Sequence, residues 1–150
     1  MTSAEFEILT VLSRYLHAID TRDAVAVGEC FAVQARATYA GPGEAESREQ
    51  IVKMLGEAGA FGDQKWGSSM HALANWRIEL TGTDEARSSI IVEAVLADMP
   101  RGSGRAQRRG LCYTDELKRQ DGVWRITARR HQLLWSHPVE GAVLPQPAGH

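Results

Sequence analysis

The feature of this sequence that most limits its fold is a change of pattern near residue 68. Before it, apolar residues recur at three- and four-residue spacings, which place them on one face of a helix. After it, alternating and Ile/Val-rich segments are typical of strands. Helices followed by strands favour an α+β fold over the βαβ alternation of a parallel sheet, and 150 residues suffice for one domain.

Three helices are expected in the first 60 residues or so. Each is preceded by a Ser, Thr or Asp that can accept a hydrogen bond from the free N–H groups of the first turn. The first helix should end near Asp20, and the second should cover residues 24–31. The expected N-cap residues are Thr2, Asp23 and Ser47.

One short strand and four longer ones are expected after or between these helices. Asp121-Gly122 predicts a tight hairpin turn, because both residues tolerate a positive φ. The basic stretch 101–109 is expected to be a solvated hairpin loop, and the segment 137–150 an irregular tail. The expected strands are residues 36–39, 70–80, 88–97, 111–117 and 123–134, with a loop at 41–43.

Composition narrows the classes of function. The formal net charge of −2 gives no overall attraction to nucleic acid or anionic lipid. The cysteines, Cys30 and Cys112, form no CxxC pair, and the five histidines show no HxH or HExxH spacing, so no metal site is expected. No GxGxxG or P-loop motif occurs, so we expect no cofactor and a chemistry that depends on side chains alone.

The amino-terminal segment has two acidic residues and no basic flank, so it does not resemble a signal peptide. No apolar run approaches the roughly 20 residues that span a bilayer. We therefore expect a cytoplasmic protein with no membrane partner.

The order of helices and strands resembles the nuclear transport factor 2-like fold, and within it the SnoaL-like and scytalone dehydratase-like group. The resemblance implies an α+β cone in which three N-terminal helices pack on a curved antiparallel or mixed sheet and enclose a pocket. It implies a domain over residues 1–136 followed by a tail over 137–150. The segments that carry it are Arg14-Tyr15, 18–20, His71 with Asn75, 77–80, 113–117 and 121–126.

The resemblance also implies a catalytic set. Asp20 and His71 match the positions at which a carboxylate orients a histidine base, and Tyr15 matches a tyrosine that lines the pocket in some members. Taken alone, Asp20 could equally be a surface turn residue, and His71 a core histidine bound to the backbone. For the last strand, simple alternation from Ile126 would point Arg130 inward, whereas the family position favours Arg129.

Further residues are candidates for substrate binding. Asn75 shares the alternation of His71, and His131 shares that of Arg129. Glu93 stands on the strand where scytalone dehydratase has a second pocket histidine. The full set of candidates is Tyr39, Met54, Trp66, Asn75, Glu93, Tyr113 and His131.

By resemblance, we expect a cofactor-independent lyase of the dehydratase type. His71 would abstract a C–H proton from a cyclic, hydrophobic small molecule, while Tyr15 and Arg129 hold an oxygen or leaving group. One alternative is an isomerase or cyclase of a polyketide- or steroid-like substrate, and another is a ligand-binding protein without catalysis. A homodimer or homotrimer is expected, with Trp76 contributing from the sheet face opposite His71.

Overall fold

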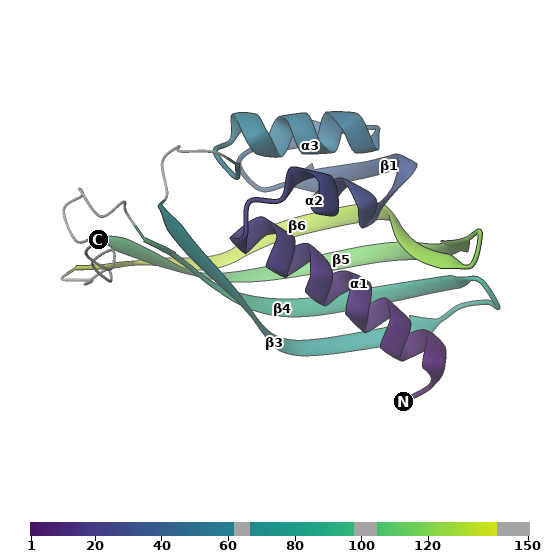
Figure 1. Ribbon diagram of the computed structural model, residues 1–150. Helices are drawn as coiled ribbons and strands as arrows, with labels where there is room; N and C mark the ends of the chain where they lie inside the picture. The colour runs from purple at the N-terminus through teal and green to yellow at the C-terminus, as the bar shows by residue number, and fades with distance from the viewer. Residues whose placement is uncertain (62–66, 98–104, 141–150) are drawn as a thin grey trace, which may run out of the picture.

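The computed structural model describes residues 1–61, 67–97 and 105–140. In this part of the chain, three helices lie on one side of one six-stranded sheet, so the expected α+β class is confirmed (Figure 1). The elements are α1 Ser3–Asp20, α2 Ala24–Glu29, β1 Phe31–Tyr39, β2 Gly43–Ala45, α3 Arg48–Glu57, β3 Ser68–Leu80, β4 Glu85–Ala97, β5 Ala106–Gln120 and β6 Val123–Val139.

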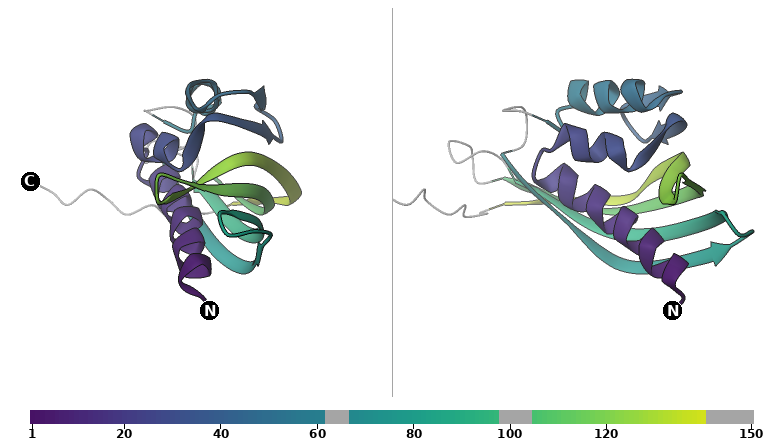
Figure 2. Two further views of the ribbon diagram at one scale, coloured as in Figure 1. Left: turned by 90° about the vertical axis from the view of Figure 1, so that its right-hand side faces the viewer. Right: turned by 45° about the vertical axis from the view of Figure 1, so that its right-hand side comes forward.

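The sheet is mixed, with the strand order β2-β1-β6-β5-β4-β3. Strands β3 to β6 form an antiparallel meander, and β1 joins it through a parallel pairing with β6. Figure 2 shows the sheet curving beneath the helices, with α1 crossing the meander and α2 and α3 lying toward β1. Each helix therefore covers a different part of the concave sheet face, which we call the inner face.

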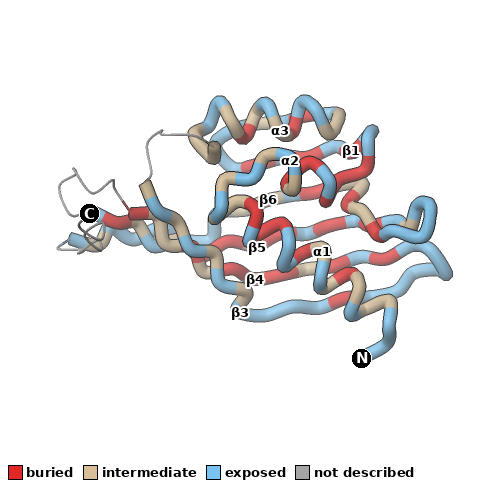
Figure 3. The backbone as a smooth tube through the Cα atoms, viewed as in Figure 1, coloured by how far each residue is buried: buried red, intermediate tan, exposed pale blue. Residues whose placement is uncertain are grey.

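The core lies between α1 and the inner face of the sheet. The buried stripe of α1 includes Ile8, Leu12 and Leu16, which are at most 3% exposed. It belongs to one core cluster with buried strand residues such as Ile90 and Ile126. Figure 3 shows buried segments in α1 and in the strands beneath it. Burying one such side chain contributes roughly 1.5–3 kcal/mol. Within the described residues, no helix has the length and apolarity needed to cross a membrane.

The expected N-caps are confirmed. The hydroxyl of Thr2 accepts a hydrogen bond from the N–H of Glu5, whose carboxylate accepts one from the N–H of Thr2. Asp23 and Ser47 cap α2 and α3 by accepting hydrogen bonds from the N–H groups of Ala26 and Gln50, at 2.9 and 3.1 Å. These short polar side chains satisfy donors that a helix start would otherwise leave unpaired.

Several boundaries differ from those expected. Helix α2 ends at Glu29, and Phe31 opens β1 by pairing with β6. Gly43, which was expected to belong to a loop, opens the short strand β2. Strand β5 begins at Ala106, so Arg108 and Arg109 belong to a strand and not to the basic loop. Strand β6 reaches Val139, so the segment expected to be an irregular tail starts as strand, and residues 141–150 lie outside the described part.

β-Bulges in β3 and β6 reverse the inward and outward alternation of side chains along these strands. In β3 the register shifts between Leu73 and Asn75, so Asn75 points away from the side of His71 and Trp76 points toward it. Both expectations based on simple alternation are therefore wrong. In β6 a shift next to Ile126 directs Arg129 inward and leaves Arg130 exposed. An inserted residue of this kind changes the face of every side chain beyond it.

Candidate active site

The last residue of α1, Asp20, binds β3 through three hydrogen bonds. Its Oδ1 lies 2.6 Å from His71 Nδ1 and accepts a hydrogen bond from the Ser69 hydroxyl at 2.9 Å. Its Oδ2 accepts one from the backbone N–H of His71 at 2.7 Å. A carboxylate at a helix C-terminus opposes the helix dipole at a cost of about 0.3–1 kcal/mol, and these donors offset it. The structure thus brings the predicted pair together.

The contact determines which nitrogen of His71 carries the proton. Burial alone would raise the pKa of Asp20, but the hydrogen bonds from His71 and Ser69 lower it further, so the pKa lies below its usual range. An ionised carboxylate only accepts hydrogen bonds, so we assign the proton to Nδ1 of the imidazole. Nε2 then keeps its lone pair, and no described residue hydrogen-bonds to it.

His71 lines a cavity between the inner sheet face and the ends of α1 and α3, which we call the interior cavity. Its volume is about 160 Å³, which restricts an occupant to a compact molecule. The apolar part of the wall includes Leu55, Leu96 and Leu111. The polar and aromatic lining residues are Tyr15, Arg22, Tyr39, Ser69, His71, Arg109, Tyr113 and His131.

Two tyrosine hydroxyls meet at this cavity. Tyr15 Oη of α1 and Tyr39 Oη of β1 are 2.7 Å apart, and both side chains are at most 5% exposed. Burial raises the pKa of both phenols, so both keep their protons at neutral pH. Their mutual hydrogen bond uses one proton, and the other remains for a ligand in the cavity.

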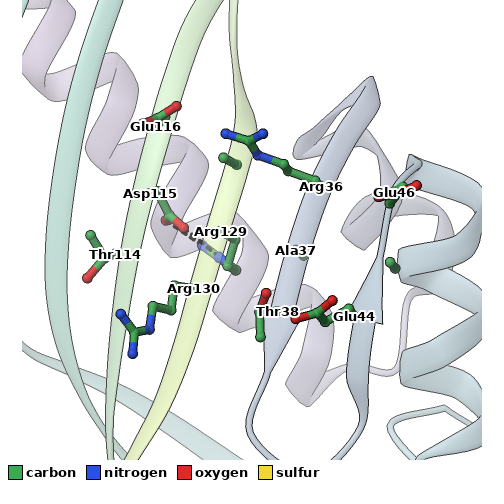
Figure 4. Close-up of a pocket in the computed structure, with 12 residues that line it drawn as sticks. Arg36, Ala37, Thr38, Glu44, Glu46, Thr114, Asp115, Glu116, Arg129 and Arg130 are labelled. Carbon is green, nitrogen blue, oxygen red and sulfur yellow. Dashed lines mark hydrogen bonds and ion pairs between the residues drawn. The ribbon is translucent and has the colours of Figure 1, made fainter.

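Arg129 lies behind the tyrosines and not in the cavity wall. Its guanidinium is fully buried and donates two hydrogen bonds to Asp115 at 2.7 and 2.8 Å (Figure 4). It also lies 4.1 Å from the ring centroid of Tyr15. Burial alone would lower the pKa of Arg129, but the Asp115 carboxylate raises it well above its ordinary value. The expected inward direction is confirmed, but the residues lining the interior cavity do not include Arg129.

His131 also lines the cavity, but its hydrogen bonding makes it a donor and not a base. Its Nδ1 accepts a hydrogen bond from the backbone N–H of Ala40 at 3.2 Å, which places the ring proton on Nε2. The ring stacks on Tyr39 at 5.2 Å between centroids and meets the edge of Tyr113. Burial first, and then the positive charge of Arg129, lowers the pKa of His131 to about 4. At neutral pH this imidazole is a neutral hydrogen-bond donor.

Three other candidates do not reach the cavity, and a fourth cannot be placed. Asn75 is exposed beyond the β3 bulge, and Glu93 lies on the outer face of the sheet, where it pairs with Arg108 at 2.7 Å. Met54 packs on the core from α3, while the next residue, Leu55, lines the cavity. Trp66 lies outside the described residues. Of the substrate-binding candidates, Tyr39, Tyr113 and His131 do line it.

Sequence reasoning missed three polar residues of the wall. Ser69 is two positions before His71, so strand alternation could have found it. Arg22 follows Asp20 in the polar turn and donates a hydrogen bond to the Ala60 carbonyl at 3.4 Å. Arg109 belongs to a basic stretch that is typical of a solvated loop. No signal in the sequence distinguishes it from Arg108.

Two other hollows of the described chain have no histidine paired with a carboxylate. A groove of about 340 Å³ on the outer face lies between β1, β2, β5 and β6, and its exposed side chains include Arg36, Glu44 and Arg130 (Figure 4). An open depression lies between α2 and α3. Among the described residues, no group of three His, Cys, Asp or Glu side chains could hold a metal ion.

Comparisons with known proteins agree with this architecture. The family model of the SnoaL-like domain matches residues 1–130. The fold is that of nuclear transport factor 2-like proteins, as shown by an NTF2-like protein of unknown function from Pseudomonas putida KT2440, with a TM-score of 0.70, 17% identity and 87% of each chain covered. No curated protein sequence matches the chain significantly.

Two similar structures have names that describe eliminations. One is a hexachlorocyclohexane dehydrochlorinase from Novosphingobium barchaimii LL02, with a TM-score of 0.81, 20% identity, and 97% of this chain and 96% of that chain covered. The other is a scytalone dehydratase-like protein from Novosphingobium aromaticivorans, with a TM-score of 0.78, 18% identity, and 89% and 86% covered. At these identities the likeness establishes the fold.

Proposed function

We propose, from the fact that this chain belongs to the SnoaL-like domain family, that its interior cavity is the active site of a cofactor-independent lyase. The observation that carries the proposal is the 2.6 Å contact between Asp20 and His71, which leaves Nε2 of a cavity-lining imidazole as a free acceptor. The names of two similar structures, a dehydrochlorinase and a scytalone dehydratase-like protein, support elimination as the type of reaction.

The substrate is a cyclic, largely hydrophobic small molecule with an acidic C–H bond. Nε2 of His71 takes the proton, and the C–H electrons form the new double bond as the leaving group departs from the neighbouring carbon. Asp20 stabilises the resulting imidazolium and holds the ring in position. When hydroxide leaves, the imidazolium returns its proton to it as water, so the enzyme is regenerated.

Hydrogen-bond donors on the cavity wall stabilise the negative charge that develops on substrate oxygen. One donor is the spare hydroxyl proton of the Tyr15–Tyr39 pair, and the other is Nε2–H of neutral His131. Arg129 acts as a positioning residue, because its buried charge lies behind the Tyr15 ring and not in the wall. Fixed donors in a site shielded from water stabilise such charge more than water does.

The test uses a β-hydroxycyclohexanone and its β-chloro analogue, whose elimination gives a conjugated ring ketone with a strong ultraviolet absorbance. We expect His71→Gln and Asp20→Asn to lower kcat by about 10²–10⁴-fold, the usual contribution of one general base. His17→Gln, on the exposed side of α1, is the matched control and should keep full activity. A rate unchanged in both site variants would contradict the mechanism.

The same samples distinguish the alternatives. In Asp20→Asn, ¹⁵N NMR should show the His71 proton leaving Nδ1, because an amide can donate a hydrogen bond to that nitrogen. A product that retains the oxygen or chlorine atom would indicate an isomerase or cyclase. A ligand recovered unchanged after hours with wild-type protein would indicate a binding protein.

A further inference from the structure

Neighbouring arginines on β5 point to opposite faces of the sheet. Arg108 lies on the outer face, where Glu93 accepts its hydrogen bonds. Arg109 pairs in register with Ala94 on the inner face and lines the interior cavity together with His71. The strand therefore carries one arginine into the proposed active site and one away from it.

Arg109 differs from Arg108 and Arg129 in its partners. Those two each bind a carboxylate, whereas the hydrogen bond of Arg109 goes to the neutral Oε1 of Gln107, at 2.7 Å from Nη2. Its Nε is buried and has no hydrogen-bond partner within the described chain. A guanidinium stays charged at any accessible pH, so a buried donor without an acceptor has a cost. That cost is removed if a ligand supplies the acceptor.

The surrounding charges favour an anion. Among the described residues that line the interior cavity there is no Asp or Glu, and the hydrogen bond of Arg109 goes to a neutral side chain. Asp20 contacts His71 from behind and is engaged by its three donors. The charge of Arg109 also contributes, after burial, Arg129 and His71, to the low pKa of His131. In the described part of the chain, Arg109 therefore brings a positive charge to the cavity wall without a carboxylate partner.

We propose that the interior cavity binds a ring compound bearing a carboxylate, with Arg109 as the partner of that carboxylate and His71 facing the reacting carbon. The assignment of the reacting end rests on the proposed elimination, whereas the binding of the carboxylate does not. Arginine suits this role because its planar fork matches the two oxygens of a carboxylate. His131, a donor on the adjoining wall, is available to an oxygen on the ring itself.

The experiment compares two probes of similar shape, cyclohexanecarboxylate and cyclohexanecarboxamide, by isothermal titration calorimetry at pH 7.5. In the wild-type protein the acid should bind about 10–100-fold more tightly than the amide, as expected for a charge-assisted hydrogen-bonded pair in a partly buried site. Arg109→Gln should abolish this preference, and Arg109→Lys should retain part of it. Arg108→Gln, the neighbour on the outer face, is the matched control and should bind like wild type.

Equal affinities for acid and amide, or a preference that persists in Arg109→Gln, would overturn the proposal. Absence of carboxylate binding up to about 10 mM would overturn it too. Repeating the titration with His71→Gln separates the two hypotheses, because this variant should keep the acid preference even if no elimination occurs in any sample. Circular dichroism of each variant verifies the fold, so a loss of binding is attributed to the side chain.

Discussion

Two imidazole rings line the interior cavity, and their hydrogen bonds assign them opposite tautomers. His71 is bound at Nδ1 by a carboxylate, so its Nε2 accepts a proton. His131 is bound at Nδ1 by a backbone N–H, so its Nε2 donates one. A base and a neutral donor thus arise from the same residue type, and the group bound at Nδ1 decides which is which.

The low pKa of His131 predicts an acid-sensitive fold. Its pKa of about 4 in the folded protein lies below the value of about 6.5 in an unfolded chain, so the unfolded state binds the proton first as the pH falls. Stability from this site is complete above about pH 6.5 and is lost toward pH 4. We expect about 2–3 kcal/mol of unfolding free energy to disappear over that interval.

Urea denaturation at several pH values measures this effect. His131→Asn keeps an acceptor for the N–H of Ala40 but does not titrate, so its stability should depend less on pH between 6.5 and 4. His137→Asn, at an exposed position of the same strand, should behave as wild type. Identical pH profiles for His131→Asn and wild type would show that His131 is not buried in its neutral form.

At the scale of single residues, the proposed base and the carboxylate beside it could be predicted from the sequence. The pairing of Asp20 with His71 came from a resemblance in motif, and the structure brings the two side chains into contact. Arg109 could not be predicted, because in the sequence it is one of several basic residues in a Gly-rich stretch. Only the strand pairing with β4 shows which of two adjacent arginines faces inward.

At the scale of elements, β-bulges decide which residues belong to the site. Beyond the bulge in β3, Asn75 leaves the inner face, and beyond the bulge in β6, Arg129 joins it. A third register shift, between Gly110 and Leu111, pairs Gly110 with Trp135 on the outer face. The simple alternation of strand side chains predicts the face of the sheet correctly only between bulges. No residue type marks the positions of these bulges reliably.

The contact between Gly110 and Trp135 leads to a stability prediction. A Cβ on Gly110 would lie 2.1 Å from Trp135 Nε1, so Gly110→Ala must displace the indole ring. We expect a loss of about 1–2 kcal/mol in the free energy of unfolding, as for other overpacked sites. In a Trp135→Ala background the same change should be neutral or stabilising, because alanine suits a strand better than glycine.

A double-mutant cycle by urea denaturation measures this coupling. The expected result is a clear interaction energy between the two positions. Additive effects of Gly110→Ala and Trp135→Ala would mean that the ring does not rest on Gly110 in solution. Arg108, whose guanidinium lies 6.0 Å from the Trp135 ring centroid, is kept unchanged in all variants.

At the scale of the whole molecule, the helices cover one face of the sheet and leave the other open (Figure 2). Met70 and Trp135 on that outer face are 57% and 46% exposed. We retain the expectation of a homodimer or homotrimer and propose the outer face as its interface, since exposed apolar side chains favour association. Trp76, which was expected to contribute from this face, lies on the other side of the sheet.

Light scattering coupled to size-exclusion chromatography tests the assembly. At micromolar concentration the wild-type mass should be two or three times that of one chain, and Trp135→Glu should shift it toward one chain by placing a charge in the interface. Val25→Glu, at an exposed position of α2, is the control and should leave the mass unchanged. A wild-type protein that elutes with the mass of a single chain would contradict the expectation.

The sequence by itself determined the order of the elements, the helix starts and the α+β class, because spacing and capping are local properties of the chain. It also contained the motif that pairs Asp20 with His71. The tertiary structure decided the extent of β1, the directions of Asn75, Glu93 and Arg129, and the entry of Arg109 into the cavity. These depend on strand register and bulges, which are set by pairing between segments distant in sequence.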